Sequence, residues 1–185
     1  SAYKAQETLE WIMSEKKAQR AVAHMKRDGL TYGNGFLKIA VIDGDISFSN
    51  PSPFSVFVDP LSTSMADVQC VTFATPTYVD DIKAKYGKQV RPEGKLNEYR
   101  SFIKADPNPS SDGLDTGYKG GMAILKESWY YKDGELRLSA WAGRTLLLDV
   151  KSPYDFIPLV VFKNYPSAHN FYGKGEPEVI ESLAV

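Results

Sequence analysis

The hydrophobic period of the chain changes shortly after residue 28, and this change limits the fold more than any other feature. Residues 3–28 contain no Pro or Gly and are rich in Ala, Glu, Lys, Gln and Met, which favour a helix. Beyond them, apolar residues alternate with polar or small ones, as at Leu37, Ile39 and Val41. A period of two is typical of a half-buried strand. The sequence therefore predicts an α+β fold in which a helix precedes strands.

The helix predicted over residues 3–28 has apolar side chains on two faces. One face carries Trp11, Ala18, Val22 and Met25, and the other carries Leu9, Ile12 and Met13. The helix therefore either contacts two layers or breaks near Ser14. Asp28-Gly29 is expected to end it, because Gly tolerates the left-handed conformation found at helix C-termini.

The rest of the chain is predicted to be mostly antiparallel strands joined by hairpins. Strands are expected over residues 37–41, 46–48, 55–58, 68–73, 124–131, 135–141, 145–150 and 159–162. Asp43-Gly44 and Lys132-Asp133-Gly134 are hairpin turn signals. One short helix is expected between strands, because Thr75-Pro76-Thr77 offers a hydroxyl cap with Pro in the first turn, and Gly87 can end the helix.

Two further segments bear on domain organisation. Between residues 105 and 121, twelve of seventeen residues are Gly, Pro, Ser, Asn or Asp, so residues 88–121 are expected to be a flexible insertion in one α+β domain of residues 1–185. A helix is predicted to begin at Glu176, with Pro and acidic residues in its first turn. Because so short a helix is marginal on its own, residues 176–185 are expected to be the truncated start of a helix in a longer protein.

Charge and cysteine content exclude several classes of protein. The 22 Lys and Arg residues balance 23 Asp and Glu residues, so there is no overall basic excess of the kind a nucleic-acid groove shows, although the balance does not exclude a local patch. Cys70 is the only cysteine, which excludes an internal disulfide and a multi-Cys metal cluster. No run of about 18 apolar residues occurs, so no membrane partner is expected.

The glycines between Gly29 and Gly35 are the only cluster that could cradle a phosphate. A dinucleotide or phosphate loop needs a strand, then glycines, then a helix whose N-terminal amides meet the anion. Here the order is helix, glycines, strand, which favours a helix stop and a turn. No cofactor site is therefore predicted.

The residues that could carry catalysis or bind a metal form no recognisable motif. His24 and His169 lack a partner at metal-ligand spacing, and Cys70 lies in an apolar strand, where it is expected to be a small buried hydrophobe. Glu127 and the Glu176/Glu178 pair could serve as glycosidase carboxylates only at a set separation in space. The sequence predicts no enzyme, no catalytic residue and no metal site; a hydrolase built from Glu127, Asp133 or His169 is a less favoured alternative.

Aromatic residues support a second alternative. Tyr130 and Tyr131 lie on a predicted strand, and aromatic side chains on strands can stack against bases or sugars. This pattern leaves open a non-catalytic carbohydrate- or nucleic-acid-binding α+β module. The positive charges that such binding needs are sparse nearby, so packing or a subunit interface is the preferred interpretation.

Six segments, in order along the chain, together carry a resemblance to one family. They are residues 9–11 with 25–35, residues 53–60 with 65–68, and residues 77–86, 127–130, 157–160 and 171–177. This set resembles the N-terminal part of the wing region of portal proteins, the head-to-tail connectors of tailed double-stranded DNA bacteriophages. Residues 88–121 have no counterpart in that pattern, and the channel-lining stem helices, clip and crown of a complete portal lie outside these residues.

The resemblance implies a structural protein of the virion. Portal subunits form a dodecameric ring at one capsid vertex, assembled in the host cytoplasm, that serves DNA packaging, DNA ejection and tail attachment. The expected partners are other portal subunits, the terminase, capsid or scaffold proteins and head-tail connector proteins. Double-stranded DNA would pass through the channel of the full-length protein and is not expected to bind this segment. The resemblance implies no catalysis and no cofactor.

Overall fold

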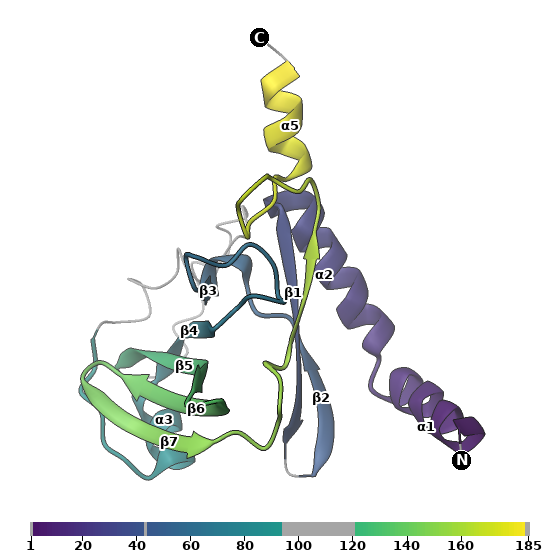
Figure 1. Ribbon diagram of the computed structural model, residues 1–185. Helices are drawn as coiled ribbons and strands as arrows, with labels where there is room; N and C mark the ends of the chain where they lie inside the picture. The colour runs from purple at the N-terminus through teal and green to yellow at the C-terminus, as the bar shows by residue number, and fades with distance from the viewer. Residues whose placement is uncertain (1, 43, 94–120, 184–185) are drawn as a thin grey trace, which may run out of the picture. The chain divides into compact units, whose positions relative to one another are not determined.

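The computed structural model describes residues 2–42, 44–93 and 121–183 (Figure 1). The helices are α1 (Ala2–Glu15), α2 (Ala18–Tyr32), the 3-10 helix η1 (Pro53–Ser55), α3 (Val79–Tyr86) and α5 (Glu176–Leu183). The strands are β1 (Asn34–Ile42), β2 (Asp45–Ser49), β3 (Val56–Val58), β4 (Cys70–Tyr78), β5 (Met122–Lys132), β6 (Glu135–Ala142), β7 (Thr145–Lys151) and β8 (Leu159–Lys163). They form sheets in the orders β2-β1-β8 and β3-β4-β5-β6-β7. The predicted α+β class, with an N-terminal helix, antiparallel strands and one short helix between them, is confirmed.

The described chain divides into two compact units. Unit 1 comprises Ser1–Gln69 and Phe156–Val185, and unit 2 comprises Cys70–Asp155. The expectation of a single domain over residues 1–185 stays a prediction. Among the described residues, no helix is both long enough and apolar enough to cross a membrane.

The N-terminal helix of unit 1 is broken, as one of the two sequence alternatives predicted. The break lies between Glu15 and Ala18, where Lys17 adopts the left-handed conformation with φ 52° and ψ 37°. Beyond the break α2 runs along β1, whereas α1 takes a different direction (Figure 1). The two helices therefore form an elbow rather than one continuous rod.

The expected stop at Asp28-Gly29 is wrong. Helix α2 continues through Gly29 and ends at Gly33, whose φ is 91° and whose amide donates to the Gly29 carbonyl at 2.8 Å. Gly29 has a packing role instead, because a Cβ there would overlap the ring of Phe162 in β8. The glycine that tolerates positive φ lies one turn later than the sequence pattern suggested.

Helix α2 covers one face of the three-stranded sheet. In β1, Leu37 lies opposite Val160 of β8, and Ile39 lies opposite Phe48 of β2. The buried cluster beneath α2 contains Ala21, Met25 and Leu37, with Val22, Phe48 and Phe162 packed against it. On the opposite face of β1, Phe36 is also fully buried, so both faces of the strand are covered near its start.

Unit 2 contains an antiparallel meander, β4 to β7. The predicted hairpin turn after β5 is confirmed, because Asp133 and Gly134 both have positive φ, 53° and 79°. A two-residue turn of this kind matches the twist of the strands that it joins. The hydrophobic core of unit 2 contains Ile82, Val90, Ala123, Leu125, Ala140, Ala142 and Leu147.

The predicted helix start at Thr75-Pro76-Thr77 is wrong. These residues continue β4, where Thr75 pairs with Leu125 and Thr77 with Ala123 of β5. Helix α3 begins only at Val79, and Tyr78 before it makes no side-chain cap. The predicted end at Gly87 is confirmed. Gly87 has a φ of 67°, and its backbone amide donates a hydrogen bond to the Lys83 carbonyl.

Most of the insertion expected over residues 88–121 lies outside the described residues. The described part, residues 88–93, packs on unit 2: Val90 is 4% exposed, and the Glu93 carboxylate accepts a hydrogen bond of 2.9 Å from the Ile124 amide. The segment is therefore anchored at its first residues.

Candidate functional site

The most constrained region of unit 1 is a junction between β1 and the segment before α5. The side chain of Asn34 is buried there, with 2% of the residue exposed. Its Oδ1 accepts a 2.6 Å hydrogen bond from the Gly173 amide, and its Nδ2 donates to the Phe171 carbonyl at 3.4 Å. One amide side chain thus satisfies two backbone groups of a segment that is distant in sequence.

Glycines surround Asn34 because backbones meet directly here. A Cβ on Gly33 would overlap the Gly173 carbonyl, one on Gly35 the Met25 carbonyl, and one on Gly175 the Thr31 carbonyl. We call Gly33, Asn34, Gly35, Gly173 and Gly175 the glycine junction. Among the sequence alternatives for the glycine cluster, this geometry fits the turn into a strand.

The segment after β8 is also tied to the region around η1. The Tyr172 hydroxyl donates to the Val56 carbonyl at 3.3 Å and accepts from the Val58 amide at 3.4 Å. Lys163 Nζ donates to the carbonyls of Thr63 and Asn170, both at 3.0 Å. These contacts join three distant segments of unit 1 into one framework.

A loop between β3 and β4 is closed by one carboxylate. Asp67 accepts hydrogen bonds from the amides of Thr63 (3.0 Å) and Ser64 (2.8 Å), and from the hydroxyls of the same two residues (2.9 and 3.1 Å). The two backbone bonds, and after them the hydroxyl bonds, hold the pKa of Asp67 far below its usual value. The charged form of Asp67 therefore organises this loop.

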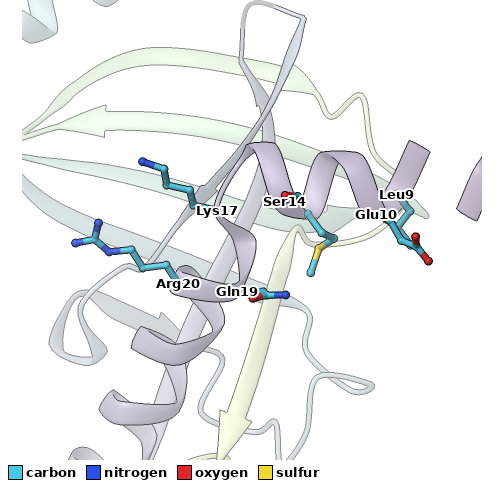
Figure 2. A pocket seen from close by; sticks show the side chains of 7 residues that line it. Leu9, Glu10, Ser14, Lys17, Gln19 and Arg20 are labelled. Carbon is cyan, nitrogen blue, oxygen red and sulfur yellow. The ribbon is translucent and has the colours of Figure 1, made fainter. Parts of the chain in front are cut away.

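A shallow hollow of about 550 Å³, open to solvent, lies at the elbow between α1 and α2. It is lined by Leu9, Glu10, Met13, Ser14, Lys17, Gln19 and Arg20, which we call the elbow hollow. Figure 2 shows Lys17 and Arg20 extending on one side of the break, with Leu9 and Glu10 along α1 on the other. The Lys16 ammonium pairs with Asp45 at the start of β2 and braces the elbow against the β1–β2 hairpin.

Glu127 of β5 is engaged by α3. Its Oε1 accepts hydrogen bonds from Lys85 Nζ and from the Tyr86 hydroxyl, both at 3.1 Å. Burial and then the Glu127 charge raise the pKa of Tyr86. Burial works to lower the pKa of Lys85, yet the neighbouring Glu127 carboxylate raises it overall. This arrangement pins α3 to the sheet and gives Glu127 a structural role.

Glu127 and Asp133, two residues of the hydrolase alternative, lie apart within unit 2. Asp133 lies in the turn six residues after Glu127, about 20 Å along an extended strand, whereas paired glycosidase carboxylates lie within about 10 Å. His24 and His169 are both exposed. Within the ranges that the structure describes, no group of three or more His, Cys, Asp or Glu residues could hold a metal ion.

The remaining sequence candidates also have local roles. Cys70 is half-buried at the start of β4, with its Sγ 4.0 Å from the Thr72 hydroxyl. Glu176 accepts hydrogen bonds from Asn164 and Tyr165, and Glu178 pairs with Lys174. These carboxylates stabilise the start of α5, in agreement with their expected place in its first turn.

Tyr130 and Tyr131 do not form one stacking surface. As neighbours in β5 they point to opposite faces of the sheet. The Tyr130 hydroxyl donates to Asp149 Oδ1 at 3.3 Å, an atom that also accepts from Arg137 Nη2 at 2.8 Å. The Tyr131 hydroxyl donates to the Asp155 carbonyl at 3.2 Å. This geometry gives the binding-module alternative no shared aromatic platform.

Sequence reasoning did not identify Asn34, Asp67 or the elbow hollow as important. A local signal existed for Asp67, since hydroxyl residues followed three or four positions later by a carboxylate are typical of a closed polar turn. The role of Asn34 depends on residues far along the chain and had no local signal. No protein-family model matches this chain, and no curated protein sequence matches it.

Proposed function

We propose that this chain is the N-terminal part of the wing region of a phage portal protein, a non-catalytic subunit of the dodecameric ring at the capsid vertex. The observation that carries the proposal is the glycine junction. Residues 25–35 and 171–177, two of the segments that carry the resemblance, meet there through Asn34 and Gly173. Segments of one ancestral fold are expected to contact one another in this way.

A second contact in unit 1 supports the proposal. Residues 53–60 and 65–68 also belong to the resemblance, and Tyr172 bonds the backbone of Val56 and Val58. Asp67 closes the loop between these two segments by accepting from Thr63 and Ser64. Three portions of the pattern thus build one framework.

In unit 2, too, segments that carry the resemblance contact one another. Residues 77–86 and 127–130 are separate parts of the resemblance, and Lys85 and Tyr86 bond Glu127 across them. The distinctive polar side chains of the pattern are therefore engaged in internal contacts. Such use of polar groups suits a subunit whose role is served by shape and interfaces.

The proposal carries definite partners and a location. Neighbouring portal subunits, terminase, capsid or scaffold proteins and head-tail connector proteins would contact the assembled ring in the virion. The channel of the full-length protein would contact double-stranded DNA. Neither an enzyme activity nor a cofactor forms part of the proposed role.

The genomic context of the coding sequence tests this proposal. We expect the open reading frame to continue beyond codon 185, to encode two long helices downstream, and to lie beside a large-terminase gene. A native stop codon after Val185, in a genome without a terminase, would overturn it.

A further inference from the structure

Helix α1 has large apolar side chains that the described part of the chain leaves exposed. Tyr3 is 72% exposed, Leu9 60% and Trp11 61%. Clustered exposed aromatic and aliphatic groups are characteristic of interaction surfaces. Within the ranges that the structure describes, α1 packs mainly against α2, which follows the break at Lys17.

These side chains form two different surfaces. Leu9 and Met13 are four residues apart, share a face and line the elbow hollow. Trp11 is two residues from Leu9, about 200° around the helix, so it faces away from the hollow of its own chain. Each copy therefore presents an aromatic projection, Trp11, and a separate depression, the elbow hollow.

The two surfaces are complementary in chemistry. The depression offers apolar Leu9 and Met13 together with the cations Lys17 and Arg20, while its one carboxylate, Glu10, is already bonded by Gln6 at 3.0 Å. The outer face of α1 places exposed Glu7 one turn before Trp11. A Trp ring fits such a site because it packs on apolar groups and attracts a guanidinium over its face.

We propose that the outer face of α1 of one copy docks into the elbow hollow of a second copy. Trp11 packs on Leu9 and Met13 beside Arg20, and Glu7 faces Lys17. Trp, Met and Arg, which contribute to this contact, are enriched in the cores of protein interfaces. A depression of this volume also falls in the range of about 300–1,000 Å³ that holds a compact ligand group.

Because the two surfaces differ, the contact is heterologous, and repeated head-to-tail contacts generate either a closed ring or an open filament. That these contacts close into a ring rests on the proposed function. The contact between α1 and the elbow hollow can be tested separately from that closure.

Disulfide trapping tests the contact directly. In a Cys70→Ser background, one chain carries Thr8→Cys and a differently tagged chain carries Gln19→Cys. Thr8 is exposed one turn before Trp11 in α1, so the thiols lie on opposite sides of the proposed contact while the Trp11 ring is kept. We expect mixed disulfide dimers to exceed both homodimers under mild oxidation. The control replaces Thr8→Cys by Leu61→Cys, since Leu61 is 88% exposed and lies outside the contact. Equal trapping by Leu61→Cys, or no trapping, would overturn the inference.

The strength of self-association of the full 185-residue chain gives a second readout. Sedimentation over a concentration series should show that Trp11→Ser weakens self-association about tenfold or more, whereas Leu61→Ser leaves it unchanged. Glu7→Lys and Lys17→Glu should each weaken it, and mixing these two variants should restore association. A chain that stays monomeric at high concentration, or a mixture without recovery, would overturn the contact.

The same cross-link separates this inference from the proposed function. If the full-length protein forms rings without the cross-link between positions 8 and 19, the contact is wrong while the portal proposal stands. If the cross-link forms but the full-length protein assembles no ring, the portal proposal fails while the contact stands.

Discussion

The amide nitrogen of Gly173 lies 2.6 Å from Oδ1 of Asn34, and this bond joins residues 139 positions apart. It connects the first strand with the segment that leads into the last helix. A buried amide in this position is costly to remove, because the backbone groups that it satisfies would remain buried without a partner.

Asn34→Ala should therefore destabilise the fold by about 1–3 kcal/mol. Urea denaturation followed by circular dichroism measures the change in unfolding free energy. Lys26→Ala is a suitable control, since Lys26 is exposed on α2 and lies outside the elbow hollow. An Asn34→Ala variant as stable as this control would show that the bond contributes nothing.

Gly35→Ala should be more damaging, by about 3 kcal/mol or more, because the new Cβ would overlap the Met25 carbonyl and force α2 away from β1. Gly44→Ala is the matched control: nothing lies within 4 Å of a Cβ there, although φ is +80°. Thermal unfolding of both variants makes the comparison. The packing account fails if Gly35→Ala melts no lower than Gly44→Ala.

The Asp67 loop should make stability depend on pH in acid. A carboxyl whose pKa is lower in the folded chain stabilises the fold above the unfolded value, here 3.8, and this contribution is lost as pH falls through the folded value. Asp67→Asn should lower the melting temperature at about pH 6, and this deficit should become smaller as pH falls from about 4 to about 2. Glu181→Gln, an exposed change in α5, should have no such effect. A deficit of Asp67→Asn that is the same at about pH 6 and at about pH 2 would contradict this assignment.

The contact of Glu127 with Tyr86 and Lys85 predicts a change at the alkaline end. Both groups have raised pKa values, so the stability they contribute is present below about pH 10 and is lost as pH rises through their folded values. Glu127→Gln should weaken this dependence, because it removes the charge that favours the protonated forms. Burial of Tyr86, the larger cause, should preserve part of it. An unchanged alkaline unfolding curve would rule out the Glu127 contribution.

Local signals in the sequence predicted those features that local physics decides. The break near Ser14, the turn at Asp133-Gly134 and the helix end at Gly87 each depend on a few neighbouring residues. The helix end predicted at Gly29 was wrong, because the role of Gly29 is determined by its packing against Phe162, more than 130 positions away. Thr75-Pro76-Thr77 resembled a helix start, but pairing with β5 kept it extended.

The candidate site was harder to predict than the fold. Asn34 acts through Gly173 and Phe171, and no periodicity in the sequence links these positions. The elbow hollow depends on the left-handed conformation of Lys17, a residue type that seldom adopts it. Local sequence propensities do not predict features that depend on long-range contacts or on unusual backbone conformations.

Native mass measurement of the protein encoded by the complete open reading frame tests the central claim most directly. The portal account predicts a closed dodecameric ring, visible as an annulus by electron microscopy of the same sample. A complete protein that remains monomeric or dimeric at every concentration measured would contradict it.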